Sequence, residues 1–85
     1  MTIMNKGNLS LRSKTFIDRE VLPHEIDIVE WNDDKEYCWT IASFEKDDED
    51  CFYIKSCGDR IDGIDWISFG ALVELGFKYL ETLEK

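Results

Sequence analysis

The chain has 85 residues, of which 10 are Lys or Arg and 19 are Asp or Glu, so its formal net charge is -9. This length permits one domain, residues 1–85, and no second core. A hydrophobic content of 44% excludes a disordered acidic tail, and the charge argues against direct nucleic-acid binding, because phosphate contacts need Lys and Arg. No apolar run approaches the ~20 residues of a membrane span. Three cysteines without a CxxC spacing predict free thiols, so we expect a cytoplasmic protein.

Residues 1–20 are the least regular part of the chain. Leu9 and Leu11 alternate with polar neighbours, which predicts an edge strand over 8–17. Pro23 ends this segment. Because the segment is mildly basic, we expect it to lie across the acidic remainder or across a second copy. Its apolar side chains would cover a patch on the sheet or the helix: Leu9, Leu11, Phe16 and Ile17.

Residues 24–57 predict an antiparallel β-meander. Ile26 and Ile28 alternate with Asp27, and two further runs, 36–44 and 51–57, are rich in aromatic and β-branched residues. Turns centred on Asp33-Asp34 and on Asp47-Asp48 would pair Ile28 with Trp39 and Ile41 with Ile54. Both hairpins then gather the large apolar side chains on one face of the sheet: Ile26, Ile28, Tyr37, Trp39, Ile41, Phe52 and Ile54.

Residues 65–85 predict a helix. Asp65 is its expected N-cap, with Ile64 and Phe69 positioned as a hydrophobic staple. An apolar stripe follows at helical spacing, formed by Phe69, Val73, Gly76, Leu80 and Leu83, and the i,i+4 pairs Glu74–Lys78 and Glu81–Lys85 support the helix. The predicted fold class is therefore α+β, an antiparallel meander of three to four strands with one C-terminal helix on its apolar face.

Two surfaces are more apolar than this fold requires. The first is the surface of the helix, where Gly70 and Gly76 predict that another backbone approaches. The second sheet face would carry Val29, Trp31, Cys38, Thr40, Ala42, Phe44, Tyr53 and Cys57, with Cys38 opposite Cys57. The N-terminal segment would cover one of these surfaces, or a protein partner or a second copy would, since interface cores use aromatic anchors; both can hold, one for each surface. We therefore expect a homodimer or a partner interface, with partner-binding residues Trp31, Phe44, Tyr53, Ile67, Leu75 and Tyr79.

No catalytic, cofactor-binding or metal site is predicted. His24 is the only histidine and has no nucleophile beside it in a recognisable pattern. The segment 59–65 lacks the spacing of a calcium loop, and the Cys and His spacing of a zinc site is absent. Cys38 and Cys57 are more simply explained as half-buried side chains than as a disulfide or redox pair. We expect a protein that is not an enzyme.

Acidic side chains concentrate between the second and third strands of the meander: Glu45, Asp47, Asp48, Glu49 and Asp50. The simplest interpretation is a solvated hairpin tip that opposes aggregation. The alternative uses the ~6.6 Å spacing of alternate strand side chains, at which carboxylates imitate a phosphate backbone. Such an acidic nucleic-acid mimic would inhibit a DNA- or RNA-binding protein, with Asp33, Asp34, Glu36, Asp59 and Asp62 as further contributors.

The short single domain, the meander over 36–57, the acidic tip and the C-terminal helix resemble, in type, small acidic accessory proteins of phages and prophages. The resemblance implies a non-catalytic protein that binds and modulates a host or phage factor. An aromatic surface patch with an acidic rim would then make the contact.

Overall fold

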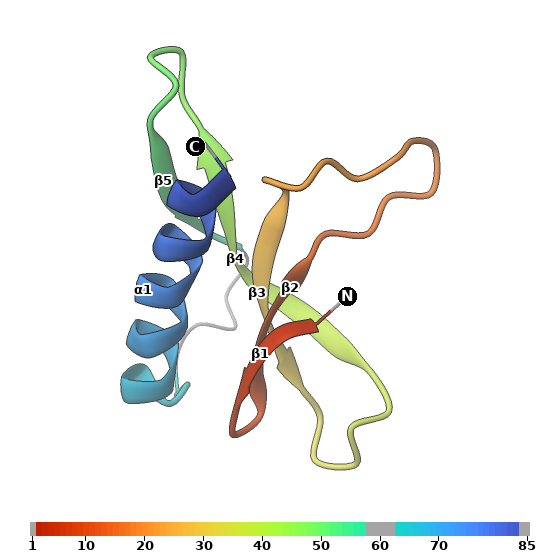
Figure 1. Ribbon diagram of the computed structural model, residues 1–85. Helices are drawn as coiled ribbons and strands as arrows, with labels where there is room; N and C mark the ends of the chain where they lie inside the picture. The colour runs from red at the N-terminus through yellow and green to blue at the C-terminus, as the bar shows by residue number, and fades with distance from the viewer. Residues whose placement is uncertain (1, 58–62, 84–85) are drawn as a thin grey trace.

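The computed structural model describes residues 2–57 and 63–83. They form a five-stranded antiparallel sheet in the order β1-β2-β3-β4-β5 and one helix, α1, on one face of it (Figure 1). The elements are β1 (Thr2–Lys6), β2 (Leu9–Ser13), β3 (Ile26–Trp31), β4 (Cys38–Lys46), β5 (Phe52–Ser56) and α1 (Trp66–Leu83). The predicted α+β class, antiparallel meander and C-terminal helix are confirmed, whereas the sheet has five strands rather than three or four.

The first hairpin, β1–β2, is absent from the sequence-based prediction. Its strands are joined by Gly7 and Asn8, and Gly7 has a φ of 61° at the first loop position, as in a type II′ turn. Because β2 also pairs with β3, it lies inside the sheet and is not an edge strand. Leu9 is buried in the core as expected of a covering segment, but Ile17 is fully exposed.

The β4–β5 turn is one residue longer than predicted and reverses the expected faces. The N–H of Asp47 donates to the carbonyl of Cys51, and Asp50 has a φ of 62°, as in a three-residue hairpin loop. Phe44 therefore pairs with Ile54 instead of Cys51. An odd shift in register moves side chains to the other face, so Ala42 and Phe44 belong to the core and not to the second face.

A β-bulge in β4 compensates for this shift. Ile28 pairs with Ala42 and Val29 with Thr40, which leaves Ile41 as the extra residue. Beyond the bulge Trp39 returns to the core face, opposite Glu30 rather than Ile28. Trp39, Phe52 and Ile54 consequently all pack against the core, as predicted, although the strand registers differ from those predicted.

The core lies between the sheet and α1. The predicted N-cap is confirmed, because Asp65 Oδ1 accepts the N–H groups of Ile67 and Ser68. The buried helix face includes Leu72, which the predicted stripe omits, while Val73 is only half-buried. The buried core residues are Leu9, Leu11, Ile26, Ile28, Ile41, Ala42, Phe44, Ile64, Phe69, Leu72 and Leu80.

The two helical glycines have different environments. A Cβ built on Gly76 would lie 2.8 and 2.9 Å from two ring atoms of Phe44 and closer still to a third, whereas a Cβ on Gly70 would meet nothing within 4 Å. The predicted close approach therefore holds at Gly76 alone, and the neighbour there is an aromatic ring rather than a backbone. The predictions for Asp59, Asp62 and Lys85 lie outside the described residues.

Candidate functional site

One face of the sheet carries no helix in the described part of the chain; we call it the helix-free face. The segment 14–25, between β2 and β3, borders it. Side chains alternate between faces along a strand, so the registers determine which residues the helix-free face carries. They include Asn5 of β1, Ser10 and Arg12 of β2, Asp27, Val29 and Trp31 of β3, Cys38, Thr40, Ser43 and Glu45 of β4, and Tyr53 and Lys55 of β5.

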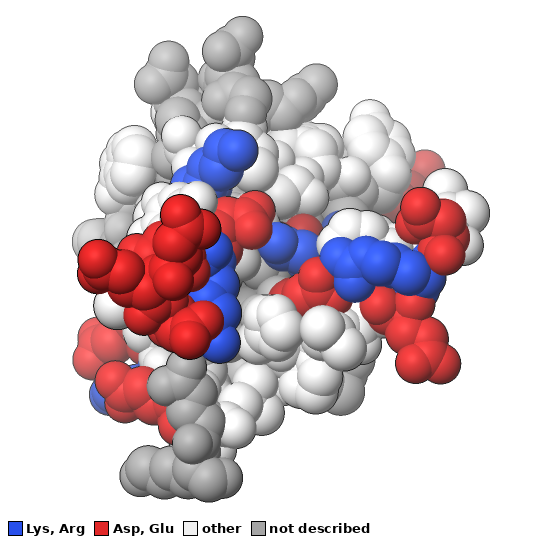
Figure 2. Space-filling model, turned by 90° about the horizontal axis from the view of Figure 1, so that it is seen from above, with Lys and Arg blue, Asp and Glu red and all other residues white. Residues whose placement is uncertain are grey.

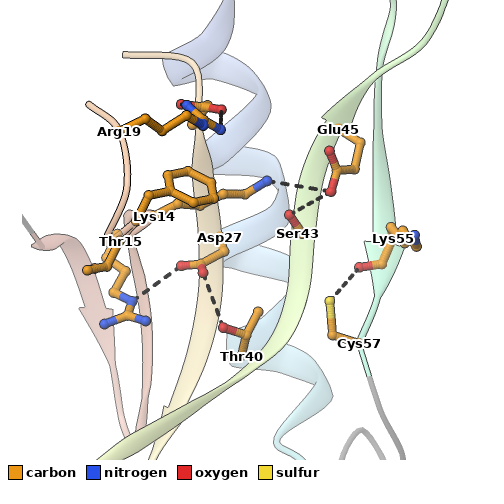
Figure 3. A pocket seen from close by; sticks show the side chains of 12 residues that line it. Lys14, Thr15, Arg19, Asp27, Thr40, Ser43, Glu45, Lys55 and Cys57 are labelled. Atoms are coloured by element: carbon orange, nitrogen blue, oxygen red, sulfur yellow. Dashed lines mark hydrogen bonds and ion pairs between the residues drawn. The ribbon is translucent and has the colours of Figure 1, made fainter. Parts of the chain in front are cut away.

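A cavity of about 580 Å³ opens on this face beside the segment 14–25; we call it the basic pocket. Figure 3 shows Lys14 and Thr15 on one side, Lys55 and Cys57 on the other, and Asp27 between them. Cations outnumber carboxylates in its lining although the whole protein carries a net charge of -9. The charged lining residues are Arg12, Lys14, Arg19 and Lys55 with Glu25, Asp27 and Glu45.

A buried carboxylate forms the floor of the basic pocket. The Asp27 side chain is only 6% exposed. Arg12 Nε donates to its Oδ1 over 3.3 Å, and Thr40 Oγ1 donates to its Oδ2 over 3.2 Å (Figure 3). Burial raises the pKa of Asp27, and the charge of Arg12 opposes that rise. Asp27 therefore holds Arg12 and Thr40 in fixed positions.

A second charged group closes the pocket on the side of the segment 14–25. Arg19 binds Glu25 through two parallel contacts, Nη1 to Oε2 at 2.8 Å and Nη2 to Oε1 at 2.5 Å. The backbone N–H of Leu22 also donates to Glu25, and together these bonds lower the pKa of Glu25 to about 2. The Arg19 guanidinium lies 3.9 Å from the centre of the Phe16 ring, so this clamp orders the bordering segment.

The two lysines of the basic pocket differ in their partners. Lys14 Nζ lies 3.5 Å from a carboxylate oxygen of Glu45 and donates to the Phe44 carbonyl over 3.4 Å. Lys55 is exposed, and its ammonium forms no ion pair with any residue in 2–57 or 63–83. Lys55 is thus the one cation of the lining with no carboxylate to neutralise it among the described residues.

Trp31 lies toward the other end of the helix-free face. Its indole N–H donates to Ser10 Oγ over 2.9 Å, and Ser10 in turn donates to Asn5. Trp31 and Asn5 also line a hollow of about 420 Å³ that Lys35 borders. The half-buried indole is therefore held in one orientation by its hydrogen bond.

The predicted partner-binding residues are scattered. Phe44 is 2% exposed between the sheet and α1, so it is corrected from an interface residue to a core residue. Tyr53 is 45% exposed and shares the helix-free face with Trp31. On α1, Leu75 and Tyr79 are half-buried against the core, whereas Ile67 is 87% exposed. Of these residues only Trp31 and Tyr53 share the helix-free face, and they lie near opposite ends of β4.

The acidic residues lie at the ends of β4. Asp47–Asp50 are exposed at the tip of the β4–β5 hairpin, the upper left of Figure 1, and acidic side chains gather on the same side in Figure 2. Asp47 Oδ1 also accepts the N–H groups of Glu49 and Cys51, so it stabilises the turn. A second acidic loop, 33–36, lies at the opposite end of β4. The two loops flank the helix-free face; Glu45 is half-buried beside Lys14.

The cysteines are not paired. Cys38 lies opposite Trp31 near one end of β4, whereas the Cys57 N–H donates to the carbonyl of Ile41. Cys38 and Cys57 are therefore not opposite each other, and all three thiols are free.

In the described ranges no group of three His, Cys, Asp or Glu side chains could hold a metal ion, and no helix there is long and apolar enough to cross a membrane.

The basic pocket was not predicted from the sequence. Its residues come from four strands, from the segment 14–25 and from Cys57 just after β5, and they follow no motif or fixed spacing. The available signal was the positive charge of the first twenty residues.

Comparison of the chain with models of protein families, with curated proteins and with solved structures gives no match.

Proposed function

We propose that the chain is a non-catalytic protein-binding module that docks a partner protein on its helix-free face. The observation that carries the proposal is the placement of Trp31 and Tyr53 on that face, between two acidic loops. Large aromatic side chains and arginines supply most of the binding energy at protein interfaces. Trp31 is held by Ser10, so it pays little ordering entropy when a partner covers it.

The charges of the two loops at the ends of the face favour a partner with basic side chains opposite those loops. The loops 33–36 and 47–50 present exposed carboxylates at both ends of β4, and they form the acidic rim of the proposed interface. Lysines or arginines of the partner would lie opposite these carboxylates, and their attraction would speed association. As the resemblance to phage accessory proteins implies, the partner would be a host or phage factor whose activity the chain modulates.

The test begins with affinity capture from a lysate at low and high salt, followed by identification and purification of the captured protein. Calorimetric titration then compares the wild type with Trp31→Ala and Tyr53→Ala, and with Ile67→Ala as the control on α1. We expect each change on the helix-free face to weaken binding about tenfold or more, and the control to bind like the wild type. A loss confined to Ile67→Ala would refute the proposed docking face.

The two exposed acidic loops also support a second candidate, an inhibitor that imitates nucleic acid by its charge. In that case the carboxylates supply most of the affinity, and binding weakens steeply with added salt. Docking through the aromatic residues predicts a much flatter salt dependence. Asp48→Asn with Asp50→Asn would weaken the mimic severely, but would mainly slow association in the aromatic mode.

A further inference from the structure

We propose that the basic pocket is a binding site for a small organic carboxylate, held by Arg12 and Lys55. This proposal does not rest on the proposed function, since a small molecule can occupy the pocket whether or not a protein docks on the same face.

Arg12 is positioned to bind an anion. Only its Nε is engaged, by Asp27, and its two terminal Nη groups have no acceptor within the described residues. Its side chain is 25% exposed and lines the pocket, so the guanidinium is accessible from solvent. Because Asp27 is itself held by Thr40, the guanidinium is fixed before a ligand arrives. The free edge of such a fork matches the two oxygens of a carboxylate.

Lys55 supplies the second contact. It lines the pocket from β5, across β4 from Asp27 of β3, and no described carboxylate neutralises its ammonium. The other cations are occupied, Arg19 by Glu25 and Lys14 by Glu45. The Lys55 ammonium is therefore the lining cation that is available to pair with the negative charge of a ligand.

The surroundings favour a monoanion with an apolar body. Glu25, Asp27 and Glu45 also line the pocket, and they would repel the doubled charge of phosphate more than the single charge of a carboxylate. The ring of Phe16 provides an apolar wall. The cavity of about 580 Å³ falls within the range of roughly 300–1,000 Å³ that is typical of small-molecule sites.

The test is an NMR titration of the full chain with sodium benzoate, with the uncharged isostere benzamide and with inorganic phosphate, all at constant ionic strength. We expect benzoate to cause saturable shifts of the amides of Arg12, Asp27 and Lys55, and benzamide and phosphate to bind at least about tenfold more weakly. Equal shifts with benzamide would show that the charge is not recognised. Tighter binding of phosphate would refute the assigned ligand class.

Three variants test the residues. Lys55→Gln removes an exposed cation that has no ion pair among residues 2–57 and 63–83, so the fold should stay intact, and we expect it to weaken benzoate binding several-fold. Arg12→Lys keeps a charge beside Asp27 but loses the planar fork, and we expect about a tenfold loss. Lys6→Gln, an equal change of charge on β1, should bind as the wild type does. If Lys55→Gln and Arg12→Lys both bind benzoate like Lys6→Gln, the assigned site is wrong.

Discussion

The two helical glycines allow a matched test of the packing between α1 and the sheet. Replacing Gly by Ala in a helix interior stabilises by about 1 kcal/mol when the new methyl group has room. At Gly70 it has room, because nothing lies within 4 Å of the added Cβ. At Gly76 it meets the ring of Phe44, which is 2% exposed and packed edge-on against Phe77 with ring centres 5.1 Å apart. The ring cannot turn away without displacing its neighbours.

Overpacking of this kind costs about 1–3 kcal/mol, which offsets or exceeds the gain in helix propensity. We therefore expect Gly70→Ala to be more stable than the wild type, and Gly76→Ala to be less stable than Gly70→Ala by about 1–3 kcal/mol. In a domain of this size each kcal/mol shifts the melting temperature by roughly 4–8 °C, so calorimetry resolves the difference.

Phe44→Leu supplies the internal control, because leucine lacks the ring atoms that the new Cβ would meet. In a double-mutant cycle the cost of Gly76→Ala should disappear when Phe44 is replaced by Leu. Equal stabilities of Gly70→Ala and Gly76→Ala, or a cost at Gly76 that persists with Leu at position 44, would refute the packing described for this contact.

Three further outcomes are expected. Asp65→Ala should lower the melting temperature at neutral pH; because hydrogen bonds from Ser68 lower the pKa of Asp65, the difference should shrink as the pH falls below 3.8. Arg12→Gln should lower the free energy of unfolding in urea by about 1–3 kcal/mol at neutral pH, because it leaves the buried Asp27 carboxylate without its cation. The loss should be smaller in acid. Burial raises the pKa of Asp27, so the folded state gains stability as the pH falls and Asp27 is protonated. For the expected homodimer, light scattering should give twice the monomer mass, and Ile67→Glu, which changes an 87% exposed residue, should give the monomer; a wild-type monomer at high concentration would exclude the dimer.

The class of fold and the helix could be predicted because their signals are local. Asp65 caps the helix through bonds to residues two and three positions away, and these bonds depend on sequence neighbours alone. The i,i+4 pair of Glu74 and Lys78 is present for the same reason, with 3.2 Å between Oε1 and Nζ. The predicted apolar stripe omitted Leu72 because Val73 fits the same helical spacing. Packing against the sheet determines which of the two side chains is buried.

The basic pocket could not be predicted because none of its signals is local. Arg12 and Asp27 are fifteen positions apart, and they meet only because β2 and β3 pair in the register that places them opposite each other. The hairpin β1–β2, which places β2 inside the sheet, is marked in the sequence only by Gly7 and its neighbour. Besides the positive charge of the first twenty residues, the sequence offered one further indication, the aspartate at position 27 between two isoleucines, because a carboxylate in an apolar strand needs a partner.

The two register errors show what a hydrophobic pattern can and cannot decide. A longer turn at Asp50 and a bulge at Ile41 each reverse the face of a segment of β4, and together they restore Trp39 to the side of Ile54. Trp39 and Ile54 lie on the same face both in the predicted registers and in the observed ones. Their shared face is therefore poor evidence for either register, because the effects of the longer turn and of the bulge cancel at these two residues. Phe44 and Ala42 lie between the bulge and the turn, so their burial distinguishes the alternatives, and Phe44 is the larger of the two. Its burial against Gly76 requires both irregularities, and it removes the most hydrophobic candidate from the helix-free face. Apart from the buried Val29, the named residues that remain there are polar, charged and aromatic, which suits recognition better than self-association.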